Sequence, residues 1–185
     1  MDVAVKDRYD SVTRGLHWLL AFLIIAEYLI ALVMDDFGIK WLHLQIGYCI
    51  LGLVILRIIW KLTHKAPPMD SSLTRLNQIL AHSGHGVMYL LMLIIPLLGV
   101  TLVVIRGMPF NVFGISIEPL MNPLVKATRH NIKQVHEYLA HTLIILVSMH
   151  ALVALLHQFV LGHPILSRML PEKLANIIEN KNGEK

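Results

Sequence analysis

The chain has 185 residues, of which 56% are hydrophobic and 15% charged, and its mean hydropathy is +0.64. This composition is too apolar for an ordinary soluble domain of that size, so a membrane is the expected solvent. Its sixteen Lys and Arg residues give a formal net charge of +4, but they gather at the ends of apolar runs, which indicates membrane topology and argues against a nucleic-acid partner. The single cysteine, Cys49, excludes a disulfide framework, a Cys-based metal site and covalent cofactor attachment through C-x-x-C-H.

Four apolar runs have the length of a transmembrane helix, which is about 20 residues. They cover about residues 16–34, 41–60, 85–105 and 134–161. The first contains His17 and Glu27, and Trp41 and Trp60 bracket the second, as is typical of membrane interfaces. Pro96 lies inside the third, where a bundle tolerates a local bend. We predict an all-α bundle of four transmembrane helices, formed by a single domain that covers residues 1–185.

The connections between these runs are polar and contain helix-breaking residues. Asp35, Asp36 and Gly38 predict a tight turn after the first run. Residues 61–84 contain two adjacent prolines and predict a connector with a short surface helix after Asp70. The longest loop, residues 106–133, has three prolines, and a charged tail follows the fourth run.

The distribution of Lys and Arg predicts the topology. Four spans place both termini on the same side of the membrane. Five of the sixteen basic residues lie on the opposite side, and the other eleven lie in the tails and the residue 61–84 connector or beside it. The five are Lys40, Arg106, Lys126, Arg129 and Lys133. Because basic residues are enriched on the cytoplasmic side, we predict that both termini are cytoplasmic.

The fourth run carries four histidines. At about 100° per residue, His136, His150 and His157 fall within about 40° of one helical face, and His141 points about 140° away. His136 and His150 lie about 21 Å apart along the helix axis, one in each half of a bilayer of about 30 Å. That spacing predicts two stacked metal centres.

Histidines of the first two runs match these two depths. His17 lies at the start of the first run, on the cytoplasmic side, at the same depth as His150. His43 lies at the start of the second run, on the outer side, at the same depth as His136. Neutral imidazole is tolerated in a membrane and is the form that binds iron. Each pair is therefore predicted to supply both axial ligands of one b-type haem held between helices.

Several sequence stretches resemble the bacterial cytochrome b561 family, over nearly the whole chain. They are GLHWLLAFL, WLHLQIG, LAHSGHGVMYLL, RGMPFNVFG and VHEYLAH…MHALVALLHQF. Members of this family are compact four-span, two-haem cytochromes of the bacterial inner membrane, and some are superoxide:ubiquinone oxidoreductases. The resemblance implies two non-covalent haem b groups, with His17 and His150 on the inner iron and His43 and His136 on the outer iron. It also implies a quinone site near His157.

Other polar residues in or beside the spans have two interpretations each. His82 and His85 are rivals of His17 as ligands, or neighbours of a propionate or a quinone. Arg57 is predicted either to hold a propionate of the inner haem or to extend to the interface. Glu27 lies on a proton path or makes a structural hydrogen bond, and His141 makes a polar contact between helices or lies at the lipid boundary.

These features predict an oxidoreductase that oxidises superoxide on the periplasmic side and reduces ubiquinone in the membrane. Lys126, Arg129 and Lys133 break the expected charge asymmetry and are predicted to attract superoxide, although basic residues also simply flank spans. The alternative is a relay subunit that exchanges electrons between quinone and a periplasmic protein of the dehydrogenase or hydrogenase type. A third hypothesis is a haem-free scaffold or transporter.

Overall fold

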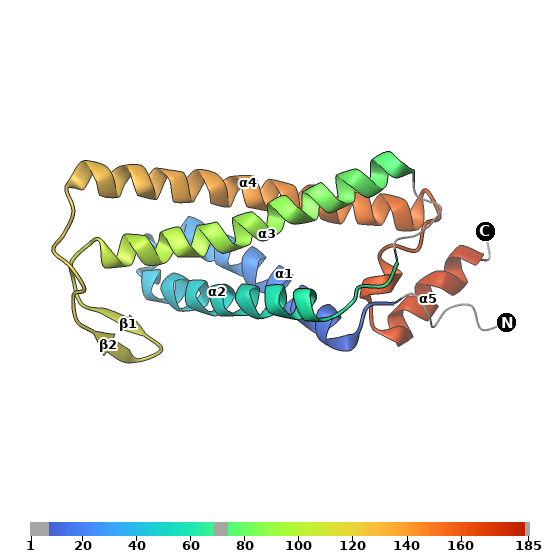
Figure 1. Cartoon of the computed structure of the whole chain (residues 1–185), viewed down its shortest axis with the longest axis horizontal. Helices are drawn as coiled ribbons and strands as arrows, with labels where there is room; N and C mark the ends of the chain where they lie inside the picture. Colours follow the sequence, from blue (N-terminus) through green and yellow to red (C-terminus); the bar gives the residue numbers. More distant parts are fainter. Residues whose placement is uncertain (1–7, 69–73, 184–185) are drawn as a thin grey trace.

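Four long helices dominate the computed structural model, which describes residues 8–68 and 74–183 (Figure 1). They are α1 (Ser11–Val33), α2 (Lys40–Thr63), α3 (Arg75–Val104) and α4 (Lys126–Phe159). Each is long and apolar enough to cross a membrane. The predicted all-α class with four candidate spans is confirmed.

Local sequence sets where the helices begin and turn. Asp10 caps α1 by accepting a hydrogen bond from the Thr13 amide at 2.9 Å, and Thr74 caps α3 by accepting one from the Asn77 amide at 3.3 Å. Such caps each stabilise a helix by about 1 kcal/mol. The predicted tight turn between α1 and α2 is present, and Gly38 takes a positive φ of 65° there, which only glycine adopts without strain.

The helices pack in chain order, α1 on α2, α2 on α3 and α3 on α4, and a smaller contact between α4 and α1 closes the bundle. Leu20, Ile50 and Val54 form the buried core between α1 and α2. Large apolar side chains such as Phe22 and Leu62 point outward, as expected when lipid surrounds the bundle.

Two helices extend beyond the apolar runs. α4 begins at Lys126, so Lys126, Arg129 and Lys133 lie on its first turns and not in a loop as the sequence indicated. α3 begins at Arg75, so the predicted connector ends earlier, and α3 continues as one helix through Pro96. The start of the short surface helix expected after Asp70 lies outside the described residues. The first turns of both helices are polar and carry no hydropathy signal. The apolar runs therefore underestimate the lengths of α3 and α4.

The two ends of the bundle differ (Figure 1). At one end a hairpin of β1 (Phe110–Val112) and β2 (Ile115–Ile117) is fastened by Gln45, whose side chain donates to the Asn111 carbonyl and accepts from the Phe113 amide. At the other end lie a 3-10 turn, η1 (Ser167–Met169), and the helix α5 (Glu172–Gly183). Much of the predicted charged tail is therefore helical.

Candidate functional site

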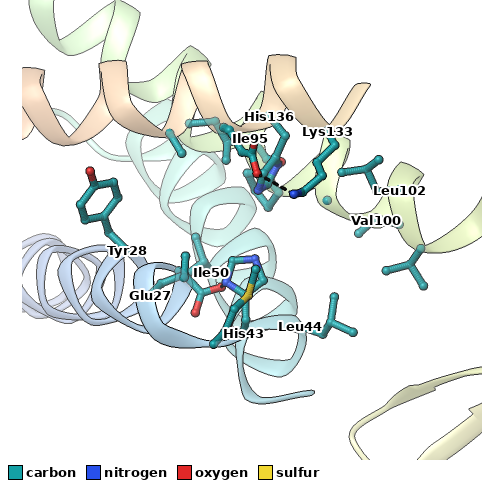
Figure 2. Close-up of a pocket in the computed structure, with 18 of the residues that line it drawn as sticks. Glu27, Tyr28, His43, Leu44, Ile50, Ile95, Val100, Leu102, Lys133 and His136 are labelled. Atoms are coloured by element: carbon teal, nitrogen blue, oxygen red, sulfur yellow. Dashed lines mark hydrogen bonds and ion pairs between the residues drawn. The ribbon is translucent and has the colours of Figure 1, made fainter. Parts of the chain in front are cut away.

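Two pairs of histidines from different helices face each other inside the bundle. In the outer pair, His43 of α2 and His136 of α4 have ring centres 6.3 Å apart and ring planes 85° apart (Figure 2). In the inner pair, His17 of α1 and His150 of α4 have ring centres 6.3 Å apart and planes 67° apart. The structure thus brings together the partners that helical depth alone matched.

The separation of the rings suits a metal ion between them. A bond from a metal to an imidazole nitrogen is about 2 Å, and that nitrogen lies about 1.1 Å from its ring centre, so two imidazoles on one ion have centres about 6.2 Å apart. Both pairs are at this distance. Within residues 8–68 and 74–183, no group of three or more His, Cys, Asp or Glu side chains is arranged to hold a bare metal ion. Two imidazoles suit haem, because the porphyrin itself supplies the other four nitrogens.

His82 and His85 are the predicted alternatives to His17 as ligands of the inner iron, and His85 fits that role less well. The ring centre of His85 is 5.2 Å from that of His150, which is too close for both to bind one iron without a shift of about 1 Å. The Nδ1 atoms of His85 and His82 each lie within hydrogen-bonding distance of a carbonyl oxygen four residues earlier in α3, which leaves Nε2 of both rings free, so the ring distance and not this contact separates His85 from His17. His17 is therefore the partner of His150 that the geometry favours.

Each paired ring has a distinct neighbour at Nδ1. His136 donates to the Ile95 carbonyl oxygen at 3.0 Å, which leaves Nε2 for a metal. Nδ1 of His43 lies 2.9 Å from Oε1 of Glu27 (Figure 2). Nδ1 of His17 lies 3.1 Å from a guanidinium nitrogen of Arg57, which can only donate. A metal at Nε2 of His17 would place the ring proton on Nδ1 and free Arg57 for another acceptor, such as a carboxylate.

A cavity of about 530 Å³ surrounds the outer pair and is lined by all four long helices. Two glycines keep space beside its polar groups. A Cβ added at Gly99 would lie 3.4 Å from the His136 ring, and one at Gly47 would lie 3.5 Å from Oε1 of Glu27. A cavity of this volume, mostly apolar and with a few polar groups aimed into it, is typical of a cofactor site.

All five basic residues predicted for the outer side line this cavity, which the sequence alone did not indicate. They are Lys40, Arg106, Lys126, Arg129 and Lys133. Lys133 pairs with Glu137 at 3.1 Å, and Nε of Arg129 is buried without a hydrogen-bond partner in the described part of the chain. Lys40 and Arg106 are the two cavity residues that the sequence patterns did not single out. Their spacing in the sequence is consistent with the cavity, because Lys40 precedes His43 by about one helical turn and Arg106 follows Gly99 by about two.

The remaining polar residues of the spans have partners or lie at the opposite end. Arg57 is partly buried and donates to the Tyr89 hydroxyl at 2.9 Å. His141 lies 2.9 Å from the Tyr28 hydroxyl, which confirms a polar contact between α4 and α1. His157 lies in the last turns of α4, where its buried Nδ1 has no hydrogen-bond partner among the residues described.

Comparison with known proteins identifies the family of the chain. The family described as prokaryotic cytochrome b561 matches residues 8–172. The chain belongs to that family. It is 31% identical to the probable superoxide oxidase CybB of Yersinia pestis over 173 residues, which are 90% of this chain and 97% of the relative. Two further relatives, from Escherichia coli (strain K12), are cytochrome b561 homolog 2, 27% identical over 89% of this chain and 92% of the relative, and cytochrome b561 homolog 1, 24% identical over 90% and 99%.

Membership in the prokaryotic cytochrome b561 family gives the coarse function. The chain is a multi-pass membrane protein that binds b-type haem and carries electrons across the membrane, as an oxidoreductase-type family does. The two imidazole pairs and the cavity around one of them fit this cofactor.

We expect each pair to hold one haem. His136→Ala should remove the outer haem and His150→Ala the inner one, because each change deletes one of two axial ligands. A pyridine haemochrome assay on purified protein should show about half of the wild-type haem per chain in either variant. His141→Ala, on the same helix but outside both pairs, is the control and should keep the full content. Full haem content in both ligand variants would contradict the assignment.

Proposed function

We propose that this cytochrome carries electrons from superoxide, on the periplasmic side, to ubiquinone in the membrane through two haem b groups. The observation that carries the proposal is the gathering of all five outer basic residues on the cavity that contains His43 and His136. Positive residues are disfavoured in translocated segments, so their concentration at one cavity indicates a role for an anion.

In the proposed orientation both termini lie in the cytoplasm, and the membrane is the bacterial inner membrane. The end of the bundle that carries α5 is then cytoplasmic, and the β1–β2 hairpin is periplasmic (Figure 1). Eleven of the sixteen basic residues support this, because the positive-inside rule assigns their side to the cytoplasm. Active alkaline phosphatase fused to the C-terminus would contradict it.

The proposed ligands are His43 and His136 at the outer level and His17 and His150 at the inner level. When bound, the two haems supply one-electron transfer between the two faces of the membrane. With two imidazoles on each iron, the haems would supply electron transfer without binding of superoxide to the metal. Arg57, which contacts Nδ1 of His17 and the Tyr89 hydroxyl, would be available to pair with a propionate of the inner haem, since guanidinium matches carboxylate geometry.

The basic residues attract the anionic substrate. A cleft lined by one sign of charge raises the encounter rate of an oppositely charged ligand by about 10- to 1,000-fold, and the gain falls with ionic strength. Lys126, Arg129 and Lys133 lie on successive turns at the start of α4, so the helix holds all three on the lining of the cavity.

The reaction balances with two superoxide ions for each quinone. Each superoxide loses one electron and becomes O₂, and ubiquinone takes two electrons and two protons to become ubiquinol. His157, at the cytoplasmic end of α4, is the proposed quinone neighbour, and its imidazole is suited to pass protons near neutral pH.

A relay subunit is the second candidate. The outer hairpin region exposes Met108, Phe113 and Ile115, which would suit contact with a periplasmic redox protein. In that case the physiological electrons come from a protein partner and not from a small anion.

Turnover without a partner distinguishes the two candidates. We expect the purified protein, given only superoxide and a ubiquinone analogue, to consume superoxide near the diffusional limit and to form the quinol. Haem reduction that needs an added periplasmic protein would favour the relay.

Changing Lys126, Arg129 and Lys133 together to Gln should lower superoxide turnover by about tenfold at low salt, because three attracting charges are removed. The dependence of the rate on ionic strength should also become flatter. The matched control is Lys65→Gln with Lys173→Gln, which removes exposed charges at the opposite end and should leave the rate unchanged. A wild-type rate and salt dependence in the triple variant would show that these residues only flank a span.

A further inference from the structure

Glu27 is an acidic residue inside a membrane span, in contact with a predicted haem ligand. It lies in α1, its side chain is 13% exposed, and Oε1 is 2.9 Å from Nδ1 of His43 on α2 (Figure 2). Oε2 of Glu27 and Nδ1 of His43 are both buried, and neither has a hydrogen-bond partner of good geometry in the described part of the chain, so the contact between the two side chains is a close approach of charge to ring nitrogen. Because a carboxylate in a membrane is unfavourable without a partner, the contact with His43 explains its place.

Glycine at position 47 makes room for this contact. A Cβ there would lie 3.5 Å from Oε1, and Gly47 is one turn after His43 on the same helix. The carboxylate therefore reaches the imidazole along the wall of the cavity that surrounds the outer pair.

A carboxylate at Nδ1 changes an imidazole in two ways. It holds the ring proton at Nδ1, so that Nε2 points its lone pair at the metal, and it makes Nε2 a stronger donor. A stronger axial donor stabilises ferric iron relative to ferrous iron and lowers the reduction potential of a haem.

Among the described residues, the neighbours at Nδ1 of His136 and of His17 are not carboxylates. His136, the second outer ligand, donates to the neutral Ile95 carbonyl, and His17 at the inner level faces the guanidinium of Arg57. A positive group near the inner haem acts in the opposite direction and raises its potential.

The basic residues around the outer cavity oppose the effect of Glu27. They line the cavity, no hydrogen bond or ion pair within the described residues joins them to a ligand nitrogen, and Lys133 is paired with Glu137. Glu27 is the charged side chain in contact with an outer ligand nitrogen, and interaction energy falls with distance, so its effect on that ligand should exceed theirs.

We propose that Glu27 is a positioning residue for the outer haem, which orients His43 through Nδ1 and lowers the outer haem's reduction potential below that of the inner haem. Electron transfer from the outer haem to the inner haem then releases free energy. The inference rests on the ligand assignment of the proposed function, but not on superoxide as the donor.

The test is the reduction potential of each haem in Glu27→Gln. Full-length purified protein is titrated with optical and electron paramagnetic resonance (EPR) detection, and the outer haem is the one absent from His136→Ala. We expect both haems to be retained, because Gln has the shape of Glu and its amide oxygen can take the place of Oε1 beside Nδ1 of His43. The outer potential should shift in the positive direction with a changed EPR signal, and the inner potential should stay in place.

Two further variants separate charge from structure. Glu137→Gln removes a carboxylate from the same cavity, next to His136 in sequence, and should shift the outer potential less than Glu27→Gln. Glu27→Asp keeps the carboxylate and should restore the outer potential towards the wild-type value, even if Glu27→Gln lost its outer haem.

An unchanged outer potential in Glu27→Gln, or equal shifts in Glu27→Gln and Glu27→Asp, would overturn the inference. Superoxide takes no part in these titrations, so their outcome is independent of superoxide turnover. A protein that does not oxidise superoxide but shows the shift would defeat only the proposed donor.

Discussion

The meeting of imidazoles from separate helices at two levels is the constraint on which the rest of the structure depends. α4 supplies one ring to each level, and its partners come from α2 at the outer level and α1 at the inner level. A pair at 6.3 Å can be shared by one iron only if the helices hold their depth and rotation. Gly99 against His136 shows how closely α3 approaches a ligand to keep that arrangement.

In apolar surroundings a polar group is stabilised by a partner, and several polar side chains of the spans find one on another helix. Tyr28 meets His141, and Arg57 meets Tyr89 and His17. These contacts join helices that otherwise present apolar faces to lipid. The same groups set the charge around each ligand pair, with a carboxylate at the outer level and a guanidinium at the inner level.

Much of the fold and the pairing of the four histidines could be predicted from the sequence, because hydropathy and helical spacing report depth directly. His136 and His150 are separated by about half a bilayer along one helix, and His43 and His17 each open a span at a matching level. The start of α4 was missed because its first turns are polar, and polarity says nothing about helix ends without a cap or breaker. The convergence of Lys40 and Arg106 on the cavity was missed because it depends on how α2 and α3 rotate in the packed bundle.

The central claim is that one chain binds two irons, each held by two imidazoles. The most direct measurement is the EPR spectrum of the oxidised, purified protein together with its haem content. The account predicts two haem b groups per chain and low-spin ferric signals from both. A high-spin signal from intact protein, or a protein that binds no haem, would contradict it.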